Sequence, residues 1–81
     1  MSVRRVTRIL VVDDQPANLL LVKAVLEPAG FQVIEARSGT EALAVAQERA
    51  PDLILLDMHL PDMHGLDVLR RLRESSWGAE P

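Results

Sequence analysis

The sequence predicts an α/β fold built on a small parallel sheet, and three observations lead to this prediction. Two runs of aliphatic residues, 9–12 and 53–56, each end abruptly in aspartate. Apolar runs without polar alternation are typical of strands buried on both faces of a parallel sheet. Segments with helical periodicity separate and follow these runs, and proline and glycine punctuate them. A strand and a helix alternating three times predict parallel strands joined by helical crossovers.

The first strand is expected over residues 8–12 and the first helix over residues 16–27. Pro16 suits the first turn of a helix, where its missing N–H costs nothing. The helix is apolar around most of its circumference, with Lys23 and Glu27 in one narrow polar sector. A helix with one buried face needs an apolar stripe of only about 100°. We therefore expect this helix to be covered on more than one side.

A second strand and a second helix are expected next. Residues 31–36 alternate from one face to the other, which is typical of an edge strand. Ser38 and Glu41 have the spacing of a capping box at the start of a helix that runs to about Ala50. One face of this helix carries mostly small side chains, which predict a close approach to the sheet. The residues of this face are Ala42, Leu43, Ala46 and Ala50.

The third strand is expected over residues 53–56, and a loop leads from it to a third helix that begins near Gly65 or Leu66. This helix is expected to bury three leucines, with Val68 flanking them: Leu66, Leu69 and Leu72. The first strand is expected at the centre of the sheet, which gives the strand order 2-1-3. Around this domain, at residues 8–74, we expect an N-terminal lead at 1–7 and a C-terminal tail at 75–81.

Composition limits the classes of protein to which the chain can belong. Its 81 residues make one small domain or a piece of one. Because it has no cysteine, a disulfide framework and a thiolate metal site are excluded, and we expect a cytoplasmic protein. No apolar run approaches the roughly 20 residues that span a bilayer. A net charge of -3 disfavours nucleic-acid binding as the main activity.

Three carboxylates are candidates for the functional site. Asp13 and Asp14 follow the first strand and Asp57 follows the third. Ligands of parallel α/β sheets bind at the carboxyl ends of the strands, so we expect these side chains to converge there. Alone, Asp13 and Asp14 would favour a helix-capping turn; together with Asp57 they favour a metal site. A separate transition-metal site at His59, Asp62 and His64 is the weaker hypothesis, because two loop histidines are more often exposed to solvent.

These motifs, taken in order and at their spacing, identify a family. They are residues 9–15, the Gly30-Phe31 turn, residues 36–42, residues 51–57 and residues 60–65. The chain resembles the receiver domain of two-component response regulators, particularly the single-domain regulators and the receivers of hybrid kinases. The resemblance implies a flavodoxin-like fold and a histidine kinase or histidine phosphotransfer protein as the partner. It implies a phosphoacceptor module and not an enzyme.

The same resemblance assigns roles to the carboxylates. Asp57 would be the phosphoacceptor, Asp13 and Asp14 would hold Mg²⁺, and the backbone carbonyl of His59 would supply another oxygen ligand. The chemistry agrees, because a carboxylate attacks phosphorus only where the charge of the phosphoryl group is neutralised, as Mg²⁺ on oxygen ligands does. The family's fourth and fifth strands, with their Ser or Thr and their Lys, are not matched; Lys23 is the single lysine and lies in the first helix.

Two other functions compete with the receiver hypothesis. An apolar third strand at the edge of a sheet is a template for another chain, so we expect self-association through that edge or through the first helix. The chain would then be a structural module with a receiver fold. The other alternative is a Mg²⁺-dependent phosphohydrolase with Asp57 as the nucleophile and His59, two positions later, as the acid-base residue; this hypothesis lacks substrate-binding elements.

Overall fold

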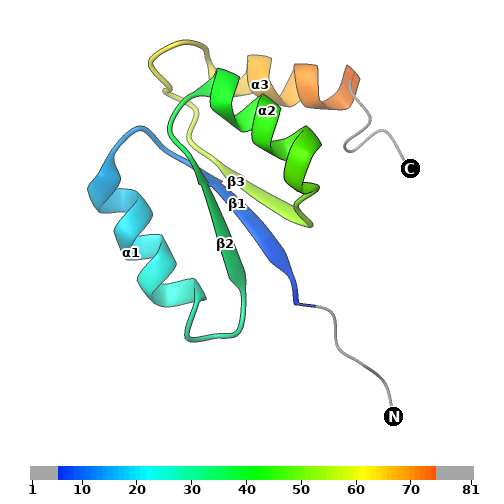
Figure 1. Cartoon of the computed structure of the whole chain (residues 1–81). Coiled ribbons are helices and arrows are strands. Elements are labelled where there is room, and N and C mark those ends of the chain that lie inside the picture. Colours follow the sequence, from blue (N-terminus) through cyan, green and yellow to red (C-terminus); the bar gives the residue numbers. More distant parts are fainter. Residues whose placement is uncertain (1–5, 75–81) are drawn as a thin grey trace.

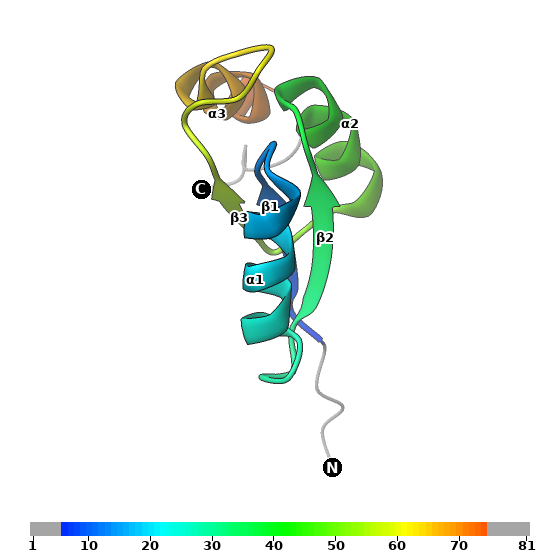
Figure 2. The same ribbon diagram turned by 90° about the vertical axis from the view of Figure 1, so that its left-hand side faces the viewer.

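The computed structural model describes residues 6–74, which form a parallel sheet with helices on both faces (Figure 1). The elements in chain order are β1 (Arg8–Val12), α1 (Pro16–Leu26), β2 (Gln32–Ala36), α2 (Gly39–Arg49), β3 (Leu53–Leu56) and α3 (Gly65–Glu74). Helix α1 covers one face of the sheet, and α2 and α3 cover the other (Figures 1 and 2). The predicted lead and tail, 1–7 and 75–81, lie largely outside the described residues.

The sheet confirms the predicted fold class and the strand order 2-1-3. Strand β1 lies at the centre and pairs in parallel with β2 and with β3. In this register Val12, the last residue of β1, lies opposite both Ala36 of β2 and Leu56 of β3. The three strands therefore end at the same level, and the residues that follow them leave from one edge of the sheet.

Alternate residues of β1 build two separate cores. Leu10 and Val12 point to the side of α2 and α3, where they are fully buried with Val68 and Leu72. Ile9 and Val11 point to the other side; there they and Leu19 of α1 form the smaller core. This alternation is the period of two that a strand imposes. The central strand therefore holds both faces of the domain together.

The prediction that β3 is buried on both faces is wrong for the described residues. Leu53 and Leu55 are 48% and 40% exposed. They share a sheet face with Ile9 and Val11 of β1, because residues paired in register point the same way. Helix α1 packs on that face over β1 and β2, and the core beneath it includes no residue of β3. The prediction that α1 is covered on more than one side is also wrong for the described residues, because Leu19 is the one buried residue of α1 and Leu20 is 70% exposed.

The start of α2 confirms the predicted capping, and its burial confirms the close approach to the sheet. The hydroxyl of Ser38 accepts the N–H of Glu41, and the Glu41 carboxylate reaches back to the N–H of Arg37. Ala42 and Ala46 are buried against the sheet. At the other end Ala50 adopts a left-handed conformation with φ 45° and is exposed; the prediction that it shares the buried face is therefore wrong.

The predicted buried face of α3 is wrong in part. Leu72 is buried as expected, but Leu66 and Leu69 are exposed and Val68 lies in the core. The reason lies at the start of the helix, where Gly65 is buried against the loop backbone. Val68, one turn later on the same face, therefore turns toward α2. No helix within residues 6–74 has both the length and the apolar character needed to cross a membrane.

Candidate functional site: an acidic cluster at the carboxyl ends of the strands

Asp13 and Asp57 are held in place by the hydrogen bonds of the sheet. The N–H of Asp13 donates to the carbonyl of Ala36 at 3.0 Å, and the N–H of Asp57 donates to the carbonyl of Val12 at 3.0 Å. These two bonds continue the pattern of the sheet by one residue beyond β1 and β3. Both aspartates are therefore fixed by backbone pairing, which does not depend on the packing of side chains.

The structure brings the three predicted carboxylates together. One oxygen from each of Asp13, Asp14 and Asp57 lies within 4.8 Å of the others. Asp14 is exposed, whereas Asp13 and Asp57 are half-buried. Carboxylate oxygens are hard ligands of the kind that Mg²⁺ and Ca²⁺ take in proteins. The donor set therefore fits a divalent cation that prefers oxygen.

Two of these carboxylates are oriented by hydrogen bonds of their own. Asp13 accepts the N–H of Gln15 on Oδ1 at 3.0 Å and the side-chain amide of Asn18 on Oδ2 at 3.1 Å. Asp57 accepts the N–H of His59 on Oδ1 at 3.0 Å. Such outer partners fix the direction of a metal ligand. Asp13 thus also holds the turn before α1, but it accepts no backbone N–H of the helix itself, whose N-cap residue is Gln15 and has no side-chain cap.

The loop between β3 and α3 forms the wall beside this cluster. A hollow of about 400 Å³ lies there, lined by Asp14 and by the loop residues 58–64. The carboxylate of Asp62 turns away to the start of α2, where it accepts the N–H groups of Gly39 and Thr40 and the hydroxyl of Thr40. These bonds, with the Thr40 hydroxyl contributing most, lower the pKa of Asp62 to about 2. Asp62 is therefore ionised throughout the neutral range.

Comparison with known proteins agrees with this geometry. Residues 9–80 match the profile of the response regulator receiver domain. The chain belongs to the response regulator receiver domain family. Among curated relatives, the transcriptional regulatory protein TrcR of Mycobacterium tuberculosis is 48% identical over 68 residues, which are 84% of this chain and 26% of TrcR.

Solved receiver structures show the same arrangement of elements. The chemotaxis response regulator CheY4 of Vibrio cholerae superposes with a TM-score of 0.89 at 33% identity, over 94% of this chain and 63% of that one. The response regulator protein TrrA of Thermotoga maritima, in complex with Mg²⁺-BeF, superposes with a TM-score of 0.82 at 37% identity, over 86% of this chain and 61% of that one. This receiver chain therefore spans less than two thirds of these solved chains.

The loop histidines of this receiver domain do not form the separate metal site considered from the sequence. Both are exposed, and their rings meet edge to face with centroids 5.9 Å apart. The Nδ1 atom of His64 accepts the N–H of Leu66 at the start of α3. Asp62, the third candidate ligand, is bonded to α2. Within the described residues, His64 therefore acts as a helix cap.

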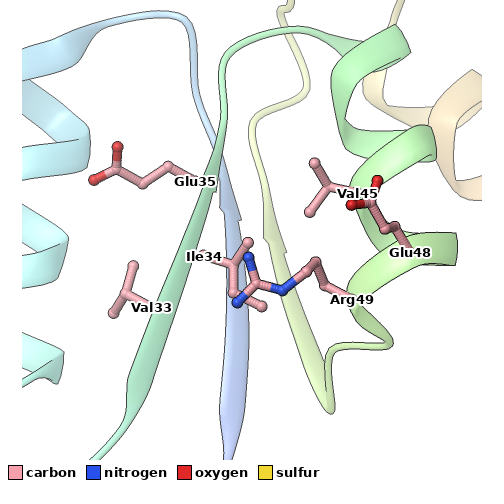
Figure 3. A pocket seen from close by; sticks show the side chains of 6 residues that line it. All are labelled: Val33, Ile34, Glu35, Val45, Glu48 and Arg49. Atoms are coloured by element: carbon pink, nitrogen blue, oxygen red, sulfur yellow. The ribbon is translucent and has the colours of Figure 1, made fainter.

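A second hollow lies at the edge of the receiver's sheet, between β2 and α2 (Figure 3). Ile34 of β2 and Arg49 of α2 lie on the α2 side of the strand, whereas Val33 and Glu35 point to the opposite side. Glu48 and Val45 complete the lining. Because none of the clustered aspartates contributes to it, we do not assign the function of the receiver to this hollow.

Sequence reasoning missed Asn18, which holds Asp13, and it missed the bonds of Asp62 to the start of α2. Asn18 follows Asp13 by five residues, a spacing that a turn into a helix allows but does not require. Asp62 reaches Gly39, which is 23 residues earlier in the chain. A bond over that distance leaves no local pattern, so the tertiary structure is needed to find it.

Proposed function

We propose that this receiver domain accepts a phosphoryl group on Asp57 from a phosphohistidine of a histidine kinase or histidine phosphotransfer protein. The convergence of three carboxylates within 4.8 Å is the observation that supports the proposal. Mg²⁺ would be held by Asp13, Asp14, Asp57 and the backbone carbonyl of His59. The domain then acts as a regulatory module in the cytoplasm, which its cysteine-free sequence suits.

The chemical step is a displacement at phosphorus. Oδ1 of Asp57 is held by the N–H of His59, and Oδ2 has no hydrogen bond among the described residues, so Oδ2 is the attacking atom. A bond forms between this oxygen and phosphorus, the bond from phosphorus to the imidazole nitrogen breaks, and its electron pair returns to the imidazole. Bound Mg²⁺ would supply positive charge to the phosphoryl oxygens. The protein contributes the nucleophile and its orientation.

Incubation with Mg²⁺ and a small acyl-phosphate donor tests this function. Intact-mass measurement is expected to show one phosphoryl adduct on the wild-type chain and none on Asp57→Asn. The substitution keeps an oxygen that can accept the N–H of His59 and removes the charged nucleophile. It therefore separates loss of the chemistry from loss of the fold.

Two further samples make the result specific. Glu48→Gln, which removes one negative charge from the far end of α2, is expected to form the adduct as the wild-type chain does. Omission of Mg²⁺ is expected to abolish the adduct. An adduct that persists in Asp57→Asn, or none in the wild type with any donor, would contradict the proposed role of Asp57.

The exposed apolar residues favour a second candidate function, self-association of the 81-residue chain. Two groups of exposed apolar side chains lie on the α1 side of the sheet. One is on β3, at Leu53 and Leu55, and the other is on α1 itself, at Leu20, Leu21 and Val25. Apolar surface of this kind on a small protein is typical of an interface. Sedimentation velocity at tens of micromolar is expected to give a dimer. A compact monomer at that concentration would exclude this association.

A further inference from the structure

One side chain, Asp62, joins the loop after β3 to the first turn of α2. Its Oδ1 accepts the N–H of Gly39 at 2.8 Å; its Oδ2 accepts the N–H of Thr40 at 2.9 Å and the Thr40 hydroxyl at 2.7 Å. We call these three bonds the Asp62 cap. The first N–H groups of a helix have no partner within it. Ser38 satisfies only the third, that of Glu41, so the Asp62 cap completes the start of α2.

Close packing holds the same loop at both ends. The side chain of Met63 packs directly against Gly39, because a Cβ at Gly39 would lie 2.6 Å from the Met63 sulfur. At the end of the loop the N–H of Gly65 donates to the carbonyl of Met58 at 2.9 Å, and a Cβ on Gly65 would lie 2.8 Å from the Met58 Cα. The loop therefore rests on α2 at one point and closes on its own backbone at another.

Residue His59 links this loop to the acidic cluster. Its N–H donates to Oδ1 of Asp57, and its backbone pairs with that of His64 in an isolated antiparallel bridge. In Figures 1 and 2 the loop, drawn in yellow, passes beside the start of α2. Movement of the loop away from α2 would therefore displace the His59 backbone relative to Asp57.

We propose that Asp62 is a positioning residue for the cation site. By holding the loop on α2, the Asp62 cap fixes the place of the His59 carbonyl and the direction of the Asp57 carboxylate, although Asp62 itself does not touch the cation. This inference rests on the function proposed above, which makes the His59 carbonyl a ligand. Loss of a group that hydrogen-bonds directly to a metal ligand typically weakens metal binding by about 10- to 100-fold. Asp62 bonds to no ligand and acts through the loop, so we expect an effect no larger than the lower end of this range.

Binding of Mn²⁺ as a substitute for Mg²⁺, followed by the electron paramagnetic resonance signal of the free ion, tests the inference. Asp62→Ala removes all three bonds and is expected to raise the Kd for Mn²⁺ about tenfold. Thr40→Val removes only the hydroxyl donor and is expected to raise the Kd less. Circular dichroism first identifies a temperature at which each variant is folded. Thr40→Val carries the test if Asp62→Ala does not fold.

Two controls distinguish positioning from a general loss of stability. Thr40→Ser restores the hydroxyl and is expected to restore the wild-type Kd. Glu48→Gln removes a charge from α2 far from the cap and is expected to leave the Kd unchanged. A folded Asp62→Ala variant that binds Mn²⁺ as the wild type does would overturn the proposal.

Amide hydrogen exchange of the metal-free protein separates failure of this inference from failure of the proposed function. In Asp62→Ala the amides of residues 58–65 are expected to exchange faster, whereas those of β1 are unchanged. Unchanged exchange in the loop would overturn the role of Asp62 whatever the metal result. If the wild type does not bind Mn²⁺, the proposed cation site is wrong. The proposal that the Asp62 cap positions a cation ligand is then wrong as well.

Discussion

Millimolar Mg²⁺ is expected to raise the melting temperature of this receiver domain, and Asp57→Asn is expected to raise it without the metal. Two like charges 4.8 Å apart repel by roughly 3 kcal/mol at an effective dielectric of about 20. Because these carboxylates are half-buried or exposed, water and salt reduce the cost to about 1 kcal/mol. For a domain of this size that corresponds to a shift of about 4–8 °C.

Calorimetry or thermal unfolding followed by circular dichroism measures both effects. Asp57→Asn is the cleanest substitution because asparagine keeps the oxygen that accepts the His59 N–H. Asp13→Asn also relieves repulsion, but it disturbs the bond with Asn18. The Mg²⁺ effect is expected to be largest for the wild type and to shrink in Asp57→Asn. If neither Mg²⁺ nor the substitution moves the melting temperature, the carboxylates do not act as a charged cluster.

Leu10→Ala is expected to cost about 2–5 kcal/mol of unfolding free energy, because it leaves a cavity in the main core. Leu10 is fully buried on the central strand, with Ile34, Val68 and Leu72 in the same core. Small domains are stable by only about 5–15 kcal/mol. This one substitution is therefore expected to remove a large share of the stability, as urea unfolding followed by circular dichroism would measure.

Leu20→Ala is the matched control, since it removes the same atoms from a side chain that is 70% exposed. In dilute solution, where the chain is not associated, it is expected to change the free energy of unfolding by no more than about 0.5 kcal/mol. At tens of micromolar, where α1 is proposed to form part of an interface, a larger loss is expected. A loss in dilute solution as large as that of Leu10→Ala would show that Leu20 is buried in the single chain, against its 70% exposure. The pair therefore tests the core and the self-association of the chain together.

The fold was predictable because its signals are local. The aliphatic run of β1, Pro16 at the start of α1 and the Ser38 cap of α2 each depend on neighbouring residues only. The acidic cluster was predictable for a related reason, since parallel strands must bring their ends to one edge. Asp13 and Asp57 follow directly from that rule.

The wrong predictions concern which face of each strand or helix is buried. That depends on how the elements pack together, which the sequence pattern indicates less directly. The run of β3 is apolar throughout, but α1 lies over β1 and β2 and leaves Leu53 and Leu55 exposed. In α3 a helical wheel allows either a face with Leu66 and Leu69 or one with Val68. The backbone contact at Gly65 decides for Val68, and that contact is set by the loop and not by the helix.

The register of the sheet makes the site sensitive to the number of residues in β3. Val12 and Leu56 are paired, and Asp13 and Asp57 each follow by one residue. Side chains alternate along a strand, so deletion or insertion of one residue within β3 would turn Asp57 to the opposite face. Exchanges among Leu, Ile and Val within β3 leave that count intact. The direction of the Asp57 side chain therefore depends on the number of residues in β3 and not on which aliphatic residues they are.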